Sequence, residues 1–169
     1  MNPLRKLYNK LCRELAQSER FAATHVRREA RRLGDTPPAR ALRALGGHAQ
    51  AMCSRLDGVE QPPQPIGVLA GRKVGELFLV LRYFLFARLI HVERSYRGTL
   101  LGFHESLSIG RLLRDVAERL DEQEMVGFCE QWLEQREPLL AIAERELHWF
   151  ADTPRQAIRP GFRMSALRE

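Results

Sequence analysis

Hydrophobic residues recur at helical spacing from the start of the chain. The first stripe is followed by Gly34, a residue typical of the position just beyond a helix C-terminus. The stripe consists of Leu4, Leu7, Leu11, Leu15, Ala22, Val26 and Leu33. We therefore expect a first helix that ends at Leu33 and carries most of its arginines on the side opposite the stripe.

A second helix is expected directly afterwards. Asp35 or Thr36 can cap its N-terminus, and the prolines at 37–38 suit a first helical turn. Its apolar stripe is formed by Leu42, Leu45, Ala49, Met52 and Leu56. The glycine pair at 46–47 weakens a helix, so it indicates either a close contact with another helix or a local break.

The middle of the chain begins with a linker and continues as its most apolar stretch. Residues 57–67 contain three prolines, which favour a stiff connection across a bundle end or along its side. Helical spacing then predicts a third helix over 68–104. Within it, residues 77–90 are apolar around most of the helix, which indicates a central helix or a dimer seam. With 14 residues and two arginines, this stretch is shorter than the roughly 20 residues of a membrane span.

Two further helical segments complete the pattern. Ser106 or Ser108 can cap a continuation of the third helix over 109–120, after a kink. A short polar turn leads to a last helix over 124–151, in which Pro138 should produce a kink.

The predicted fold class is all-α, because no run of residues alternates as a strand does. Two antiparallel helix pairs joined by a longer connection describe a four-helix up-down bundle with a long central third helix and a proline-rich crossover. We expect the bundle to span residues 1–152 as a single domain, followed by a basic C-terminal tail over 153–169.

Charge is unevenly distributed along the chain. The net charge is +6, and the first 33 residues hold nine basic and three acidic side chains, whereas the remainder is balanced. Segregated charge serves self-association as readily as nucleic-acid binding. The cluster of Arg27, Arg28, Arg31 and Arg32 suggests contact with a phosphate backbone. Cations at a helix C-terminus also complement the helix dipole, and no known nucleic-acid-binding motif accompanies them.

Catalytic signatures are missing from the sequence. The three cysteines form no Cys-x-x-Cys pair, and reduced thiols in the cytoplasm are the simplest interpretation. The stretch 69–73 lacks the residues of a phosphate-binding loop, and no Gly-x-Ser-x-Gly elbow occurs. These features favour a protein that is not an enzyme.

Several carboxylates and one imidazole lie on or beside the apolar stripes, where a metal site inside the bundle could use them. They are Glu14, Glu29, His48, Glu93, Glu134 and Glu137. Carboxylate and imidazole ligands suit iron and manganese. The alternative is a purely structural role, in which each glutamate pairs with an arginine at the edge of a stripe and His48 lies at the boundary of the core.

Over residues 68–150, the chain resembles the ferritin-like superfamily. The resemblance is carried by Glu93-x-x-Tyr96 and by the run Trp132-Leu133-Glu134-Gln135-Arg136-Glu137. It implies a carboxylate-bridged di-iron or di-manganese site in which Tyr96 orients a carboxylate. Neither expected Glu-x-x-His pair is intact, because Leu45 precedes His48 and Arg145 precedes His148 at that spacing.

The leading hypothesis is therefore a non-catalytic helical-bundle protein that acts by self-association, such as a homodimer, or by binding a protein partner, with no cofactor. A di-metal protein is the alternative, and nucleic-acid binding through the first helix is the second alternative. Tyr96 is otherwise expected to pack its ring and to place its hydroxyl on a carboxylate.

Overall fold

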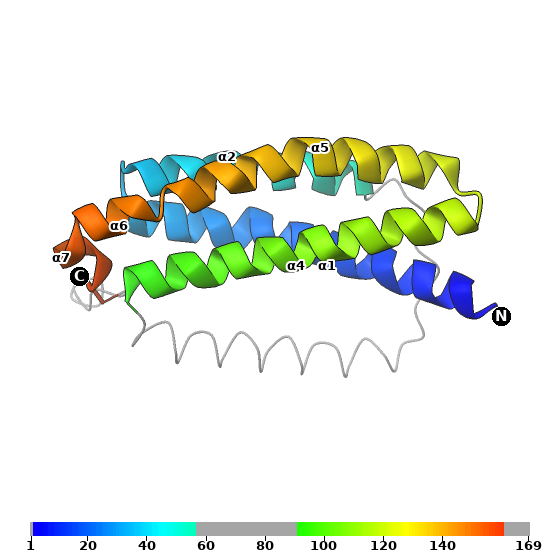
Figure 1. Cartoon of the computed structure of the whole chain (residues 1–169), viewed down its shortest axis with the longest axis horizontal. Coiled ribbons are helices and arrows are strands. Elements are labelled where there is room, and N and C mark those ends of the chain that lie inside the picture. The colour runs from blue at the N-terminus through cyan, green and yellow to red at the C-terminus, as the bar shows by residue number, and fades with distance from the viewer. Residues whose placement is uncertain (1, 57–90, 161–169) are drawn as a thin grey trace, which may run out of the picture.

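The computed structural model describes residues 2–56 and 91–160, and this part of the chain is helical (Figure 1). It contains no β-strand, and His91 and Pro160 form an isolated bridge. The helices are α1 (Pro3–Leu33), α2 (Pro37–Leu56), α4 (Val92–Arg119), α5 (Gln123–Arg145), α6 (His148–Asp152) and α7 (Pro154–Ala157). The linker predicted over 57–67 and the apolar stretch of the third helix over 68–90 lie outside the described residues.

The four long helices lie side by side (Figure 1). Helix α1 packs against α2 and α4, and α5 packs against the same two helices from the other side. Each of these neighbouring pairs is antiparallel, so the diagonal helices α1 and α5 run in the same direction. Two ion pairs join α1 to α5 or to the residue just before it, each at a separation of 117 residues: Arg5 with Glu122, the N-cap of α5, and Glu19 with Arg136. The two ion pairs lie two heptads apart on both chain segments, so the alignment of α1 with α5 stays constant between them.

The predicted end of α1 at Leu33 is confirmed, and the structure adds a cap at its start. The side chain of Asn2 accepts a hydrogen bond of 2.9 Å from the backbone N–H of Leu4. At the other end, Gly34 adopts a φ of 72°, a left-handed conformation that a side chain would strain. Local chemistry therefore sets both ends of this helix.

Helix α2 begins at Pro37, as predicted, and Thr36 accepts a long hydrogen bond of 3.4 Å from the backbone of Ala39. The helix continues through its glycine pair. A Cβ atom on Gly46 would lie 3.5 Å from Val26, so this glycine marks a close approach between α1 and α2. Of the two interpretations of the pair, the close contact is correct and the break is wrong.

The kink predicted around Ser106 and Ser108 is wrong, because α4 is continuous from Val92 to Arg119. The hydroxyl of Ser106 donates to the carbonyl of Phe103, and that of Ser108 donates to the carbonyl of His104. Both serines thus bond to the preceding turn instead of capping a new helix, which a serine inside a helix can do.

The last helix is also shorter than predicted, since α5 ends at Arg145 and α6 begins at His148. Short hydrogen-bonded turns break it: the N–H of Leu147 donates to the Glu144 carbonyl. The break places the Phe150 ring 5.2 Å from the Tyr96 ring. Tertiary packing of an aromatic residue therefore accompanies the end of this helix.

Part of the predicted tail folds back onto the bundle. Helix α7 follows α6, and the backbone N–H of Val92 donates to the carbonyl of Arg159 at 3.1 Å. Ala157 is buried. The described residues 153–160 thus pack beside the start of α4.

Candidate functional site

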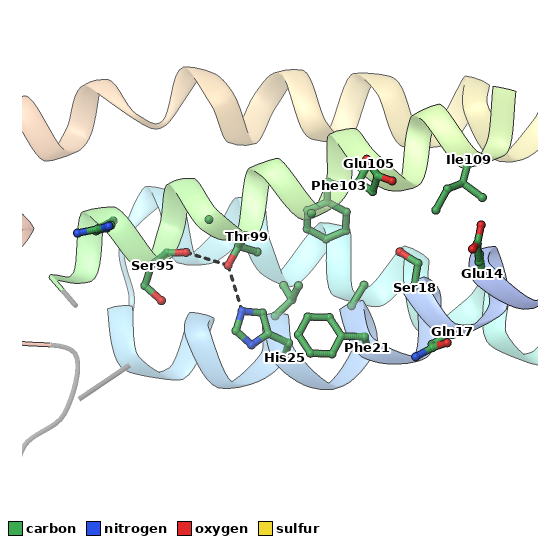
Figure 2. Close-up of a pocket in the computed structure, with 15 residues that line it drawn as sticks. Glu14, Gln17, Ser18, Phe21, His25, Ser95, Thr99, Phe103, Glu105 and Ile109 are labelled. Atoms are coloured by element: carbon green, nitrogen blue, oxygen red, sulfur yellow. Dashed lines mark hydrogen bonds between the residues drawn. The ribbon is translucent and has the colours of Figure 1, made fainter. Parts of the chain in front are cut away.

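A groove of about 710 Å³ runs between α1 and α4 (Figure 2). Phe21 and His25 of α1 face Thr99 and Phe103 of α4 across it, and Ile109 lies towards its other end. The Phe21 side chain remains 57% exposed. The volume of the groove and its mostly apolar lining match the usual properties of a binding site.

Two glycines of α4, Gly98 and Gly102, line this groove one helical turn apart. A Cβ atom built on either residue would meet no heavy atom of the described chain within 4 Å. Glycine inside a helix is about 1 kcal/mol less favourable than alanine. No described neighbour lies close enough to need glycine at these positions. The close approach of another helix would need it.

One end of the groove carries a hydrogen-bonded polar network. Thr99 donates its hydroxyl proton to the carbonyl of Ser95 at 3.0 Å, so the 3.2 Å contact with His25 needs Nε2–H of the imidazole as donor. The Ser95 hydroxyl donates to Glu29, which also accepts from Arg32. With its proton directed to a carbonyl, Thr99 is not an activated nucleophile.

The imidazole of His25 is held mainly by packing. It stacks on Phe21 with 5.0 Å between ring centroids. Burial lowers its pKa, the carboxylate of Glu29 opposes this change, and Arg32 and Arg28 reinforce it. Burial therefore favours a neutral imidazole at the polar end of the groove.

An ion pair between Glu19 and Arg136 lies in the centre of the bundle, beneath the groove. Both side chains are 0% exposed. The Arg136 guanidinium lies 5.1 Å from the ring centroid of Phe103 and 5.3 Å from that of Trp132. Phe103 thus separates the groove from the ion pair.

Burial opposes the charge on both partners of this pair. It raises the pKa of Glu19, although Arg136 and the Trp132 indole lower it, and it lowers the pKa of Arg136 despite the attraction of Glu19. Oε1 of Glu19 and both Nε and Nη1 of Arg136 are buried without a hydrogen-bond partner in the described structure. A buried pair of this kind contributes little to the net free energy of folding. Its main effect is to specify that α1 and α5 pack together.

Sequence reasoning missed Glu19 and Arg136 as central residues. A signal was present, because Arg136 follows Trp132 and precedes Leu140 by one turn and so interrupts an apolar stripe. The candidate chosen on this stretch of the helix was Glu134, which the structure shows to be exposed.

Among the described residues, the structure does not gather three of the candidate metal ligands into one group, and most of them have other partners. The contacts are Glu14 with Lys10, Glu29 with Ser95 and Arg32, His48 with Gln135, Glu93 with Arg97, and Glu137 with Arg111. Within residues 2–56 and 91–160, no group of three or more His, Cys, Asp or Glu side chains could hold a metal ion. The interpretation of glutamates paired with basic side chains fits these contacts better.

The hydroxyl of Tyr96 has a backbone partner. This fully buried side chain donates to the carbonyl of Ala143 at 2.7 Å, so the expected carboxylate acceptor is wrong. The bond ties α4 to α5, and Tyr96 therefore orients a helix and not a metal ligand.

The arginines at the end of α1 differ in their surroundings. Arg27, Arg28 and Arg31 are exposed, whereas Arg32 pairs with Glu29 at 2.6 Å. The hypothesis of phosphate binding therefore retains three exposed cations and no second supporting feature.

Comparison with known proteins found no matching family model, curated protein or solved structure. None of the described helices is long and apolar enough to cross a membrane. The function is therefore inferred from the geometry of the described residues.

His48 should make the stability of the protein depend on pH. Burial, reinforced by the charge of Arg136, lowers its pKa from 6.5 to about 4, although the bond to Gln135 raises it. The unfolded chain therefore binds a proton more readily than the folded chain. The resulting stability is fully present above pH 6.5 and is lost as the pH falls towards 4.

We expect His48→Gln to unfold with a weaker pH dependence than the unmodified protein between pH 6.5 and pH 4.5. Urea unfolding at several pH values measures the slope. Equal slopes for the two proteins would contradict the assignment of a half-buried, neutral His48.

Proposed function

We propose that this protein is a non-catalytic helical bundle that acts by docking an apolar helix in the groove between α1 and α4. The docked helix belongs to a second copy, in self-association, or to a protein partner. An amphipathic helix lying in an apolar groove is a common mode of recognition. From Ser95 to Ile109, the α4 wall extends over about 21 Å at 1.5 Å per residue, enough for four turns of such a helix.

The glycine wall of the groove carries this proposal. Gly98 and Gly102 leave open space on a surface that also presents the exposed ring of Phe21. Small residues spaced by four positions allow two helices to approach closely. A helix docked against this surface would offset the loss of helix stability at both glycines.

We also propose that the fold is a four-helix up-down bundle with ferritin-like connectivity. The antiparallel pairs α1–α2 and α4–α5 support this proposal, as does the long connection between α2 and α4. A single long crossover distinguishes ferritin-like bundles from simple up-down bundles. The di-metal function of that superfamily is not part of the proposal, because nothing in the described structure supports it: no group of three or more potential ligands occurs there.

Filling the groove tests the docking function. We expect Gly102→Leu to destabilise the protein and to raise bis-ANS fluorescence severalfold, because leucine would displace the docked helix and expose its apolar surface. Gly127→Leu on α5 is the matched control, since Gly127 is also an exposed helical glycine with open space around it. It should stabilise the protein by about 0.5–1 kcal/mol through helix propensity.

The sign of the stability change in Gly102→Leu distinguishes a groove that holds a helix from a groove that holds none. A groove that holds no helix would make Gly102→Leu stabilising, like Gly127→Leu, with unchanged dye binding. Urea unfolding and dye titration of both variants at equal concentration would show this, and that result would overturn docking of a helix supplied by this protein itself, as in self-association.

A further inference from the structure

We infer that residues 68–90 of this same chain occupy the groove between α1 and α4. The inference rests on the proposed docking function and names the helix that occupies the groove until a second copy or a partner displaces it. It follows from where the described segments end, from the length of chain between them, and from the chemistry of the groove.

The chain must return along the bundle between α2 and α4. Near its end, α2 lies beside the first half of α5, where Arg55 donates to Gln131 at 2.8 Å. Helix α4 begins at the opposite end, where Ser95 contacts Glu29 close to the end of α1. The end of α2 and the start of α4 are therefore separated by much of the 28-residue length of α4, about 42 Å, a distance that the connection between them has to span.

The length of the segment suits this path. As the helix that its spacing predicts, residues 68–90 would extend over about 35 Å, and the apolar stretch 77–90 over about 21 Å. The second value equals the length of the α4 wall of the groove. The proline-containing residues 57–67 remain to cross the end of the bundle.

The groove is also the face that matches the segment chemically. Exposed polar pairs cross the α4–α5 face, from His104 to Glu144 and from Arg111 to Glu137. The α1–α4 face instead presents Phe21 and the two glycines of α4. A helix that is apolar around most of its surface leaves the least apolar area exposed to water when it lies against this face. A partner helix would then bind only by displacing residues 68–90.

Thiol labelling of Gly102→Cys in the full-length chain tests this inference. Gly127→Cys is the matched control, and peptide mass spectrometry separates both sites from the native cysteines. We expect Gly102→Cys to react at least tenfold more slowly, equally at 1 and 100 µM protein. Adding Leu81→Asp and Leu85→Asp should restore most of its reactivity, because charged side chains would expel the segment.

Crosslinking identifies the chain that supplies the helix. In Gly102→Cys/Leu81→Cys, a bifunctional maleimide should give a product with the mass of one chain on a denaturing gel. A product of double mass, with protection of Gly102→Cys that grows with concentration, would overturn the inference and leave the proposed docking function standing. Equal labelling of Gly102→Cys and Gly127→Cys at every concentration would overturn both.

Discussion

Arg136→Met is expected to destabilise the protein by about 3–5 kcal/mol, because it leaves the carboxylate of Glu19 buried without a partner. The double variant Glu19→Met/Arg136→Met should recover most of this loss, since a pair of apolar residues carries no desolvation penalty. Urea unfolding followed by tryptophan fluorescence measures all three free energies. Arg111→Met is the control, because its ion pair with Glu137 is half exposed and should contribute less than about 1 kcal/mol.

The loss in Arg136→Met should also depend on pH. Burial raises the pKa of Glu19 in the folded protein, and removing Arg136 removes an influence that lowers it. The folded variant then binds a proton more readily than the unfolded chain, so its deficit should shrink as the pH falls from 7 towards 5. A deficit that is the same at both pH values, or that persists in the double variant, would contradict the central role of the ion pair.

Gly110→Ala is expected to destabilise the protein by about 1–3 kcal/mol, although alanine favours a helix. The added Cβ would lie 2.5 Å from Cζ3 of Trp132, whose side chain is fully buried and cannot move aside freely. Gly47→Ala on α2, which has open space, serves as the control and should stabilise. Equal stability of the two variants would show that Trp132 does not need Gly110.

A second substitution tests the cause of this loss. Combining Gly110→Ala with Trp132→Phe should cost less than the sum of the two changes, since the smaller ring makes room for the methyl group. Strict additivity would assign the effect of Gly110→Ala to something other than contact with Trp132.

Helix ends were predictable where a capping residue acts on its own neighbours. Gly34 and Pro37 marked correct boundaries for this reason. Ser106 and Ser108 were misinterpreted because a serine hydroxyl can cap a new helix or bond to the preceding turn. The choice between these roles depends on the helices that pack around it.

The candidate site was less predictable than the fold. Helical periodicity placed Glu29 on or beside the apolar stripe of α1, where the structure shows it bonded to Ser95 at one end of the groove. It could not identify the glycines of α4 as a groove wall, because an open surface is defined by what does not pack there. The six candidate ligands were predicted from their places on or beside the apolar stripes, and a stripe does not specify which residues of different helices come together.

The sequence by itself determined the helical class of the described chain and most helix boundaries, because periodicity and capping act over a few neighbouring residues. Only the tertiary structure decided that Glu19 meets Arg136, 117 residues away, and that α1 and α4 leave a groove between them. Those outcomes depend on the direction, register and packing of whole helices, which no local stretch of sequence specifies.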